Sequence, residues 1–332
     1  MRRIVIILAT LGLVACGTTT GAPEPTEQGS TTTVAPPTTV TSESTTTSLA
    51  PVETSTTQAP ATTTTTTASV TTTSVSATTT SQAATSMQVA PYFYVDEAGH
   101  SERSGPFVLP VAREVPATGA VARAALVQLF AGPTAAETQS VPAISTAIPS
   151  GVQLLGLTIN EDVATIDLSS EFGATEDSAT VAQRAAQVVF TLSRFDSVAE
   201  VVFNQDGKPV SIQIGDGSLV SRPVGIWDYL EFAAAITVET PVYGGPAGNP
   251  LRATGFGALF EATLKYALAD DDGLILEEGI AMTNNGTGWG GFDFTIDYEV
   301  DERQVGALIV WANSAKDGSQ IDVREYPVVL RP

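Results

Sequence analysis

The chain contains very little cysteine, histidine and positive charge, and each shortage excludes a class of function. Its 332 residues include one cysteine, Cys16, and one histidine, His100. A disulfide framework within one chain and a cysteine-rich zinc site are therefore excluded. The chain also lacks the cysteine and histidine side chains on which most familiar nucleophilic and metal-dependent reactions depend. We accordingly predict no metal site and no cofactor.

Positive charge is scarce enough to exclude one kind of partner. Lysine and arginine number 15 against 36 aspartates and glutamates, which gives a net charge of −21. Nucleic acids and anionic lipid surfaces bind proteins through clustered lysine and arginine, and no basic run follows Arg2 and Arg3. We therefore expect no nucleic-acid binding.

The N-terminus has the layout of an export signal. Arg2 and Arg3 precede an apolar run at residues 4–12 that is too short to span a bilayer stably. The sequence LVAC at residues 13–16 resembles the lipobox of bacterial lipoproteins. The resemblance implies cleavage after residue 15 and a lipid on Cys16, which would anchor the chain at the outer face of the cytoplasmic membrane. An ordinary signal peptide with a chance cysteine is the alternative.

Residues 16–86 form a segment of low complexity. It is mostly threonine, serine, proline, alanine and valine, and it contains no aromatic residue. Such a segment cannot bury enough apolar surface to offset the entropy lost on ordering. We predict a disordered N-terminal tether, whose composition is also typical of O-glycosylated stalks.

Residues 87–217 are predicted to form an α+β domain. One helix is expected at residues 119–131, capped by Thr118 and stopped by Gly132, and a second at residues 178–193, capped by Ser178. The expected strands are residues 92–95, 107–115 with an interruption at Pro110, 198–203 and 209–214. Two helices packed on a small sheet would bury the apolar face of each element.

Residues 146–172 are predicted to contain a β-hairpin with one buried face. If Glu161 and Asp162 form the turn, Ile159 faces Ala164, Leu157 faces Ile166 and Leu155 faces Leu168. All six side chains then point the same way, because strand side chains alternate between faces.

The first region resembles the GerM-type (GerMN) domain, a family named for sporulation and germination proteins. The resemblance rests on LFAGP at residues 129–133, IPSGVQLL at 148–155 and VATIDLSSEF at 163–172, in that order. It implies a small α+β domain without known catalysis, used in envelope assembly or partner binding.

After a linker at residues 215–225, residues 223–332 change to a series of short strands. The candidates are residues 236–238, 257–268, 273–282, 291–300, 307–312 and 321–330. Phe292, Phe294, Ile296 and Tyr298 alternate onto one face, and turn-rich segments separate the strands. This pattern predicts an all-β sandwich.

The second region resembles the immunoglobulin-like domain that accompanies GerM-type domains in spore germination proteins. The matching pieces are residues 240–244, 258–263, 286–292 and 326–330. The resemblance implies an extracytoplasmic adhesive or structural module without a known ligand.

Acidic residues supply the main candidates for catalysis. Glu171, Glu176 and Asp177 could form the paired carboxylates of a glycosidase, or they could simply be acids near a helix N-terminus. Ser169 and Ser170 do not lie in the G-x-S-x-G pattern of a nucleophile elbow. His100 stands in a polar loop with glycine and serine, where it could be a catalytic base but where an exposed histidine without a chemical role is far commoner.

Other candidates concern binding. The acidic run of Asp270, Asp271 and Asp272 lacks EF-hand spacing and favours a solvated turn over a calcium site. Trp289, in a glycine-rich loop, and Tyr243 are candidate ligand contacts, although Trp289 could instead fill the sandwich core. Trp227 and Tyr229 are expected to seal the junction between the two regions.

These observations favour a non-catalytic lipoprotein of the cell envelope, linked to sporulation, germination or wall assembly. Its expected partners are the membrane, through the lipid on Cys16, and a cell-wall polymer or envelope protein. The alternative is a wall-polysaccharide hydrolase that uses the acidic residues of the GerM-type domain.

Overall fold

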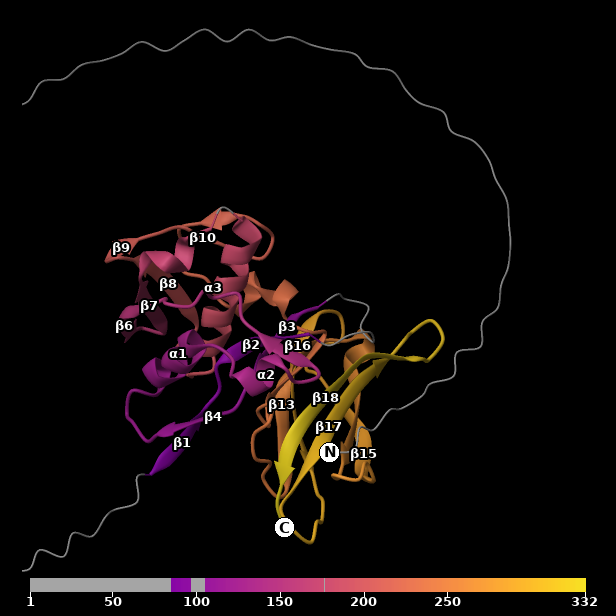
Figure 1. The fold of residues 1–332 in the computed structure, drawn as a ribbon. Coiled ribbons are helices and arrows are strands. Elements are labelled where there is room, and N and C mark those ends of the chain that lie inside the picture. The colour runs from indigo at the N-terminus through magenta and orange to yellow at the C-terminus, as the bar shows by residue number, and fades with distance from the viewer. Residues whose placement is uncertain (1–84, 97–104, 176) are drawn as a thin grey trace, which may run out of the picture. The chain divides into compact units, whose positions relative to one another are not determined.

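A computed structural model describes residues 85–96, 105–175 and 177–332 (Figure 1). The first folded region carries three helices, α1 (Val121–Ala131), α2 (Ala135–Thr138) and α3 (Ser178–Leu192). Its strands are β1 (Ser86–Val89), β2 (Tyr92–Asp96), β3 (Phe107–Pro110), β4 (Arg113–Pro116), β5 (Ala143–Ser145), β6 (Leu154–Asn160), β7 (Val163–Leu168), β8 (Glu200–Gln205), β9 (Lys208–Pro209), β10 (Ile212–Gln213) and β11 (Leu219–Val220).

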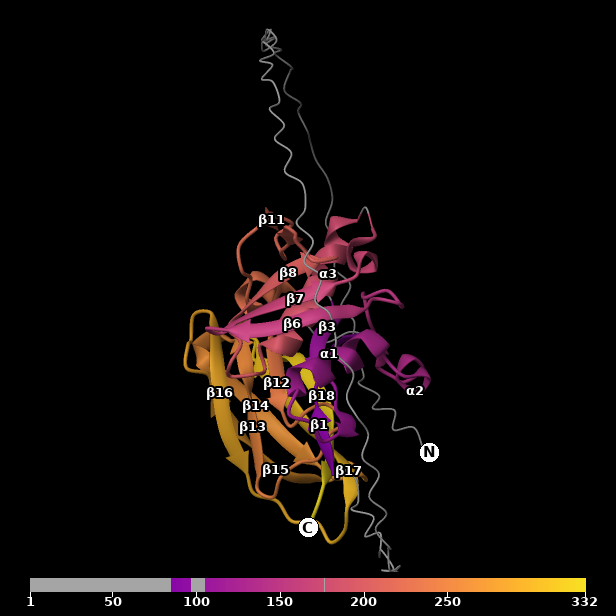
Figure 2. The same ribbon diagram turned by 90° about the vertical axis from the view of Figure 1, so that its left-hand side faces the viewer.

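Two small sheets organise this region, in the orders β6-β7-β8-β9 and β3-β2-β5. β6 and β7 form an antiparallel hairpin, whereas β7 and β8 run parallel and are joined through α3 (Figure 2). A parallel pair needs such a crossover connection, and a helix is the usual one. The α+β prediction for this region is confirmed.

α3 is buried along most of its length, including polar residues that need partners. Gln187 donates to the Tyr92 carbonyl and accepts from the Ala147 amide, both at 2.9 Å. Arg184 donates from Nε to the Ala147 carbonyl at 3.0 Å. Because buried polar groups are costly unless bonded, these bonds tie α3 to β2 and to the loop between β5 and β6.

The predicted hairpin forms with two of its three expected pairs. Ile159 faces Ala164 and Leu157 faces Ile166, but Leu168 faces Leu154 instead of Leu155. A β-bulge between Leu154 and Gly156 shifts the register and turns Leu155 outward, where it is 47% exposed. The alternation of apolar and polar residues does not indicate where a bulge inserts an extra residue, so the sequence did not predict this shift.

The helix ends differ slightly from expectation. The first helix begins at Val121, and Thr118 accepts a hydrogen bond from the Ala120 amide without capping the helix itself. Asp177 caps α3, because its carboxylate accepts from the Ala179 amide at 3.2 Å. Ser178 is the first residue inside that helix, so the prediction of a Ser178 cap is wrong by one residue.

β1 and β4 form a separate two-stranded sheet. Its buried residues, Val89 and Val115, pack with Ala125 of α1 in a cluster that is distinct from the main hydrophobic core. β1 is the first described strand, so it directly follows the predicted tether. The predicted tether ends too late, because Ser86 already belongs to β1. The rest of the predicted tether up to residue 84, the predicted export signal and Cys16 lie outside the described residues.

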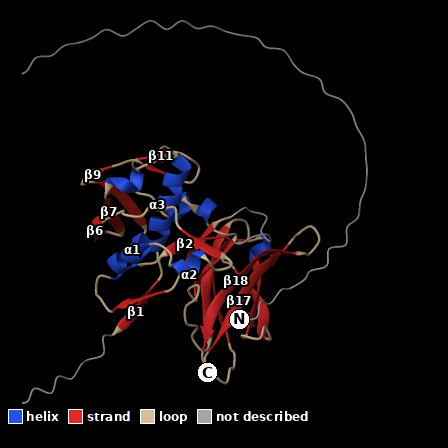
Figure 3. Ribbon diagram, in the orientation of Figure 1, coloured by secondary structure: helices blue, strands red, loops and turns tan. Residues whose placement is uncertain are grey.

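The second folded region is a sandwich of two antiparallel sheets, as predicted. Its strands are β12 (Ile236–Thr240), β13 (Leu251–Ala258), β14 (Thr263–Ala269), β15 (Ile275–Met282), β16 (Trp289–Ile296), β17 (Gln304–Asn313) and β18 (Gln320–Leu330). The sheets have the orders β12-β13-β16 and β15-β14-β17-β18. Figure 3 shows that this region is built almost entirely of strands and loops, whereas the helices gather in the first region.

One predicted strand, residues 257–268, is two strands in the structure. β13 ends at Ala258 and β14 starts at Thr263, each in a different sheet. Between them Glu261 and Ala262 take the left-handed conformation, with φ of 55° and 58°. Non-glycine residues rarely adopt this conformation, so composition did not indicate the break.

Among the described residues, no helix is both long and apolar enough to cross a membrane.

Packing around α1 yields the first testable prediction. Leu129→Ala should lower the free energy of unfolding by about 2–5 kcal/mol, because Leu129 is fully buried and its truncation leaves a cavity. Val127→Ala, on the exposed side of the same helix, should cost less than about 0.5 kcal/mol. Urea unfolding followed by circular dichroism measures both; equal losses would contradict the described packing of α1.

Candidate functional site at the junction of the two regions

The junction between the two folded regions begins with paired backbones. The Ala112 amide donates to the Tyr243 carbonyl at 3.0 Å, and the Tyr243 amide donates to the Pro110 carbonyl at 3.1 Å. These bonds accompany a parallel bridge between Val111 and Tyr243. The end of β3 is thereby joined to the loop that follows β12.

A partly buried polar contact lies beside this bridge. The Tyr92 hydroxyl of β2 donates to Oε1 of Glu239 in β12 at 2.8 Å, and Arg194 donates to the Glu239 carbonyl at 3.1 Å. Burial, and then the charge of Glu239, raise the pKa of the Tyr92 phenol well above its usual value. The phenol is therefore held in its neutral, donating form.

Aromatic rings continue the contact from one region into the other. Tyr92 stacks on Phe190 of α3 with ring centroids 5.3 Å apart, and Phe190 stacks on Phe256 of β13 at 6.3 Å. Phe256 in turn lies 5.7 Å from Trp289 of β16. Offset aromatic pairs of this kind add stabilisation beyond the area that they bury.

A cation–π contact lies on the β18 side of the junction. The guanidinium carbon of Arg324 lies 4.6 Å from the centre of the Phe107 ring in β3. Arg324 is only 2% exposed and Phe107 only 1%. A desolvated guanidinium over an aromatic face is among the stronger contacts of this type.

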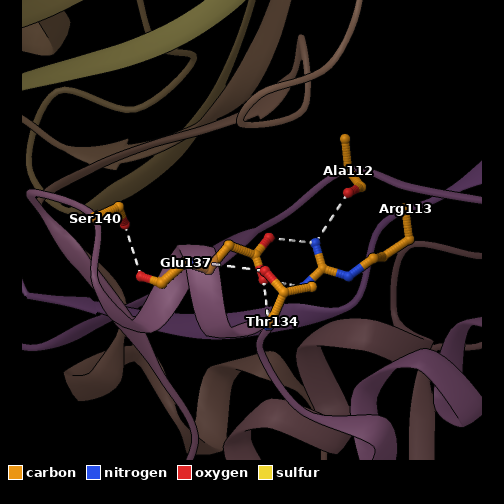
Figure 4. Close-up of polar contacts among 5 residues, drawn as sticks. All are labelled: Ala112, Arg113, Thr134, Glu137 and Ser140. Carbon is orange, nitrogen blue, oxygen red and sulfur yellow. Dashed lines mark hydrogen bonds and ion pairs between the residues drawn. The ribbon is translucent and has the colours of Figure 1, made fainter. Parts of the chain in front are cut away.

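Arg113 forms a polar cluster that supports the bridging segment (Figure 4). Its guanidinium makes two 2.7 Å bonds to the two carboxylate oxygens of Glu137 and a 3.0 Å bond to the Ala112 carbonyl. Glu137 also closes the capping box of α2 with Thr134. These bonds hold α2 against Ala112, whose amide donates to the Tyr243 carbonyl.

The two regions share one hydrophobic core as a result. Buried residues of both, from Tyr92 to Leu330, belong to a single packed cluster. Interfaces between domains of one chain are usually polar and permit relative motion unless they are large and apolar. Here the shared core and the backbone bridge make the junction an apolar, hydrogen-bonded interface of the kind that restricts relative motion.

The two candidate ligand contacts lie at or beside this junction. Tyr243 is half-buried, supplies the backbone bridge and packs its ring edge-on to Tyr326, with centroids 6.3 Å apart. Trp289 is half-buried against Phe256. These contacts give both side chains structural roles, and their contact with a ligand stays a prediction.

The residues expected to seal the junction behave differently from each other. Tyr229 is fully buried, and its hydroxyl donates to the Gln213 carbonyl at 3.0 Å. Trp227 is 68% exposed, so the expectation that it seals the junction is wrong. The short 3-10 turn η2 (Ile226–Asp228) presents this indole to solvent.

The acidic run after β14 forms a turn, as favoured. Asp270 accepts hydrogen bonds from the amides of Asp272 and Leu274, at 3.0 and 2.8 Å. No group of three or more metal-ligating side chains occurs among the residues that the structure describes.

The candidate catalytic residues have local structural roles. A hydrogen bond from Ser169 lowers the pKa of Glu171, and one from Thr180 lowers the pKa of Asp177. The Ser169 hydroxyl also accepts from the Gln153 amide at 3.0 Å, which closes the hairpin. Ser170 opens the short turn η1 (Ser170–Gly173). His100 and Glu176 lie outside the described residues.

Sequence reasoning missed the residues that build the junction, chiefly Tyr92, Arg194, Glu239 and Arg324. One of them left a signal. Arg324 stands in the inward-facing series with Tyr326, Val328 and Leu330, where a charge needs a specific partner. The partners of the other three lie far away in sequence and could not be inferred.

The two regions define a protein in which an α+β domain is fused to an immunoglobulin-like sandwich, and comparison with families agrees. Residues 91–211 match the Germane family, described as "Sporulation and spore germination". Residues 235–319 match Gmad2, the "Immunoglobulin-like domain of bacterial spore germination". The chain therefore carries a GerM-type domain followed by the immunoglobulin-like domain of spore germination proteins, which confirms the resemblances seen in the sequence.

Comparison with solved structures finds similar chains. The tandem GerMN domains of the sporulation protein GerM from Bacillus subtilis share 15% identity at a TM-score of 0.35, over 66% of this chain and 64% of that one. The first of those domains alone gives 18% identity and 0.33, over 42% and 99%. A candidate lipoprotein from Clostridium perfringens gives 18% and 0.30, over 45% and 93%.

The chain thus spans less than two thirds of the tandem GerM structure. Comparison with curated proteins finds no match.

Removal of the Tyr92 hydroxyl tests the polar contact at the junction. Tyr92→Phe should lower the free energy of unfolding by about 1–3 kcal/mol at neutral pH, because the buried Glu239 contact is lost while the ring stacking remains. Unfolding in urea, followed by near-ultraviolet circular dichroism, measures the loss.

The same variant should also change the dependence of stability on alkaline pH. A tyrosine whose folded pKa is raised stabilises the fold fully below its unfolded pKa of about 10, and that contribution is lost as pH rises further. Stability should therefore fall above pH ~10, and it should fall less steeply in Tyr92→Phe. An unchanged slope would contradict the buried, neutral phenol.

Two ion pairs of contrasting burial give a matched comparison. Arg113→Ala should cost about 2–4 kcal/mol, because Glu137 would be left partly buried without its partner. Arg252→Ala breaks a pair whose side chains are 66% and 54% exposed, and should change stability little. Thermal unfolding of the two variants measures the difference; equal effects would show that the Arg113 cluster does not support the junction.

Proposed function

We propose that this chain is a lipid-anchored protein of the cell envelope whose rigid pair of domains serves as a non-catalytic binding or scaffolding module. The lipid would be attached at Cys16, and residues 17–84 would separate the membrane from the folded part. The partner would be a cell-wall polymer or another envelope protein. The family descriptions, which concern sporulation and germination, support a role in those processes or in assembly of the wall.

The shared core of the two domains is the observation that carries this proposal. A binding or scaffolding surface built from two domains needs them held at a fixed angle, and the junction supplies this through backbone bonds, stacked rings and buried polar contacts. An enzyme that closes on its substrate would favour a mobile junction instead.

The alternative, a wall-polysaccharide hydrolase, has less support. A glycosidase needs one carboxylic acid whose pKa is raised so that it can protonate the leaving group. The pKa values of Glu171 and Asp177 are both lowered instead, by hydrogen bonds that stabilise the ionised form. Neither side chain therefore has the raised pKa that the acid of a glycosidase needs.

Crosslinking in cells tests the proposal. The full chain, crosslinked and recovered from membranes, should enrich a specific envelope protein or wall fragment relative to a chain truncated after residue 84. Cys16→Ser should move the protein out of the membrane fraction, because the thiol that carries the lipid is missing. Mass spectrometry of the recovered material identifies the partner.

Two outcomes would contradict the proposal. Equal recovery by the full chain and by the truncated chain would remove the binding role. Cleavage of wall glycans by the purified protein, lost in Glu171→Ala or Asp177→Ala, would establish the hydrolase in its place.

A further inference from the structure

β15 is an edge strand whose outer side is unpaired in the described structure. It lies at the end of the sheet β15-β14-β17-β18 and pairs only with β14 (Figure 1). The opposite edge strand, β18, is covered. The Gly244 amide donates to the Pro327 carbonyl at 2.8 Å, and the Ala247 amide to the Val329 carbonyl at 2.9 Å. Of the two edges of this sheet, β15 is therefore the one left open among the described residues.

The exposed side chains on and beside β15 are unusually apolar. Leu274, Ile275, Ile280 and Met282 are 66%, 45%, 64% and 64% exposed. Ile280 faces Lys265 of β14, so a charged side chain borders these apolar residues and they gather along the edge itself. Exposed apolar side chains grouped in this way are typical of interaction sites.

These side chains are not needed to complete the sandwich core. Ala281 is the buried residue of the strand. Gly279 lies directly against the Tyr266 hydroxyl, with no room for a Cβ atom, and Tyr266 stacks on Phe294 at 4.7 Å. The inward side of β15 is thus closed by its own sheet and by β16, while its apolar outward residues have no packing role.

Charge indicates what can cover this edge. Glu277 and Glu278 stand side by side in the middle of β15 and are exposed, and the acidic turn at residues 270–272 precedes the strand. Against these acids, β14 supplies one lysine, Lys265. An added strand with lysine or arginine opposite the two glutamates would gain cross-strand charge pairs.

A second copy of this chain fits the edge poorly. The centre of β15 lies between Glu278 and Gly279, so antiparallel pairing of two copies in full register would gather four carboxylates near the centre, and β15 has no basic residue to neutralise them. Like charges across a strand pair are destabilising, and each chain carries a net charge of −21.

We propose that β15 binds an extended, cationic polypeptide segment of a partner protein, which adds to the sheet as a further strand. Main-chain hydrogen bonds to β15 supply affinity, as in other cases of strand addition. Basic side chains of the segment face Glu277 and Glu278, and apolar side chains cover Ile280 and Met282. This inference rests on the proposed binding role and assigns one surface to it.

A peptide assay tests this assignment on the purified protein. The probe is a synthetic peptide as long as β15 with two adjacent lysines, one for each face of the strand, among valines, because the consecutive residues Glu277 and Glu278 lie on opposite faces. Its binding is followed by fluorescence anisotropy. The double variant Glu277→Lys with Glu278→Lys should bind it about tenfold more weakly, because two favourable charge pairs become repulsive. Ile280→Ser should weaken binding a few-fold through lost apolar contact.

The control keeps the net charge of the double variant but leaves β15 unchanged. Glu299→Lys with Glu325→Lys reverses two exposed acids outside this strand and should bind the peptide as the wild type does. A peptide with glutamate in place of lysine should not bind the wild type. Proline at alternate positions should abolish binding, because main-chain donors are removed.

Several results would overturn the inference. The first is that the lysine peptide does not bind the wild-type protein. The second is that the β15 double variant and its charge control bind the peptide equally well. The third is that ultracentrifugation shows a wild-type dimer that Ile280→Ser dissociates. Crosslinking in cells separates this failure from failure of the proposed function. If the β15 double variant recovers the same partner as the wild type, the binding role stands and the edge is the wrong surface.

Discussion

The junction between the two folded regions is governed by the need to satisfy polar groups that neither region could satisfy alone. Tyr92 is completely buried, and its hydroxyl donates to Glu239 of the other region. Arg324 is nearly as buried and lies over Phe107, across the same boundary. An unpaired buried hydroxyl or guanidinium would cost more than an ordinary contact contributes. If the two regions separated, the Tyr92 hydroxyl and the Arg324 guanidinium would both lose these partners.

That constraint explains several features beyond the contacts themselves. α3 must present Phe190 toward Phe256 while Gln187 holds the backbone of β2, so the helix serves both the first core and the junction. The Arg113 cluster fixes Ala112, whose amide completes the bridge to Tyr243. The two domains thus share one packed core, in which polar and aromatic contacts of the first region continue into the sheets of the second.

Sequence patterns predicted what is local and missed what is distant. Alternation located the hairpin pairs from Ile159 to Ile166 and the inward face of Phe292 to Tyr298, because each depends on neighbours within a few residues. The sequence pattern did not predict the bulge at Leu155 or the left-handed conformation of Glu261 and Ala262. Many sequences tolerate such irregularities, and few carry a residue type that indicates them. The Tyr92 contact spans 147 positions, and no periodicity can report a pairing at that range. Tyr243 and Trp289 are candidate ligand contacts from the sequence, and the structure gives both a place in or beside the junction.

The separate packing of β1 has a mechanical consequence. Any tension transmitted along the chain from residues before Ser86 enters the folded part at this strand, which pairs only with β4. Its small cluster with Val115 and Ala125 is distinct from the main core. Only four residue pairs and a few side chains would have to separate at this point of entry. Unpairing of β1 would release the length of one strand, which would spare the joined domains from the first part of the load.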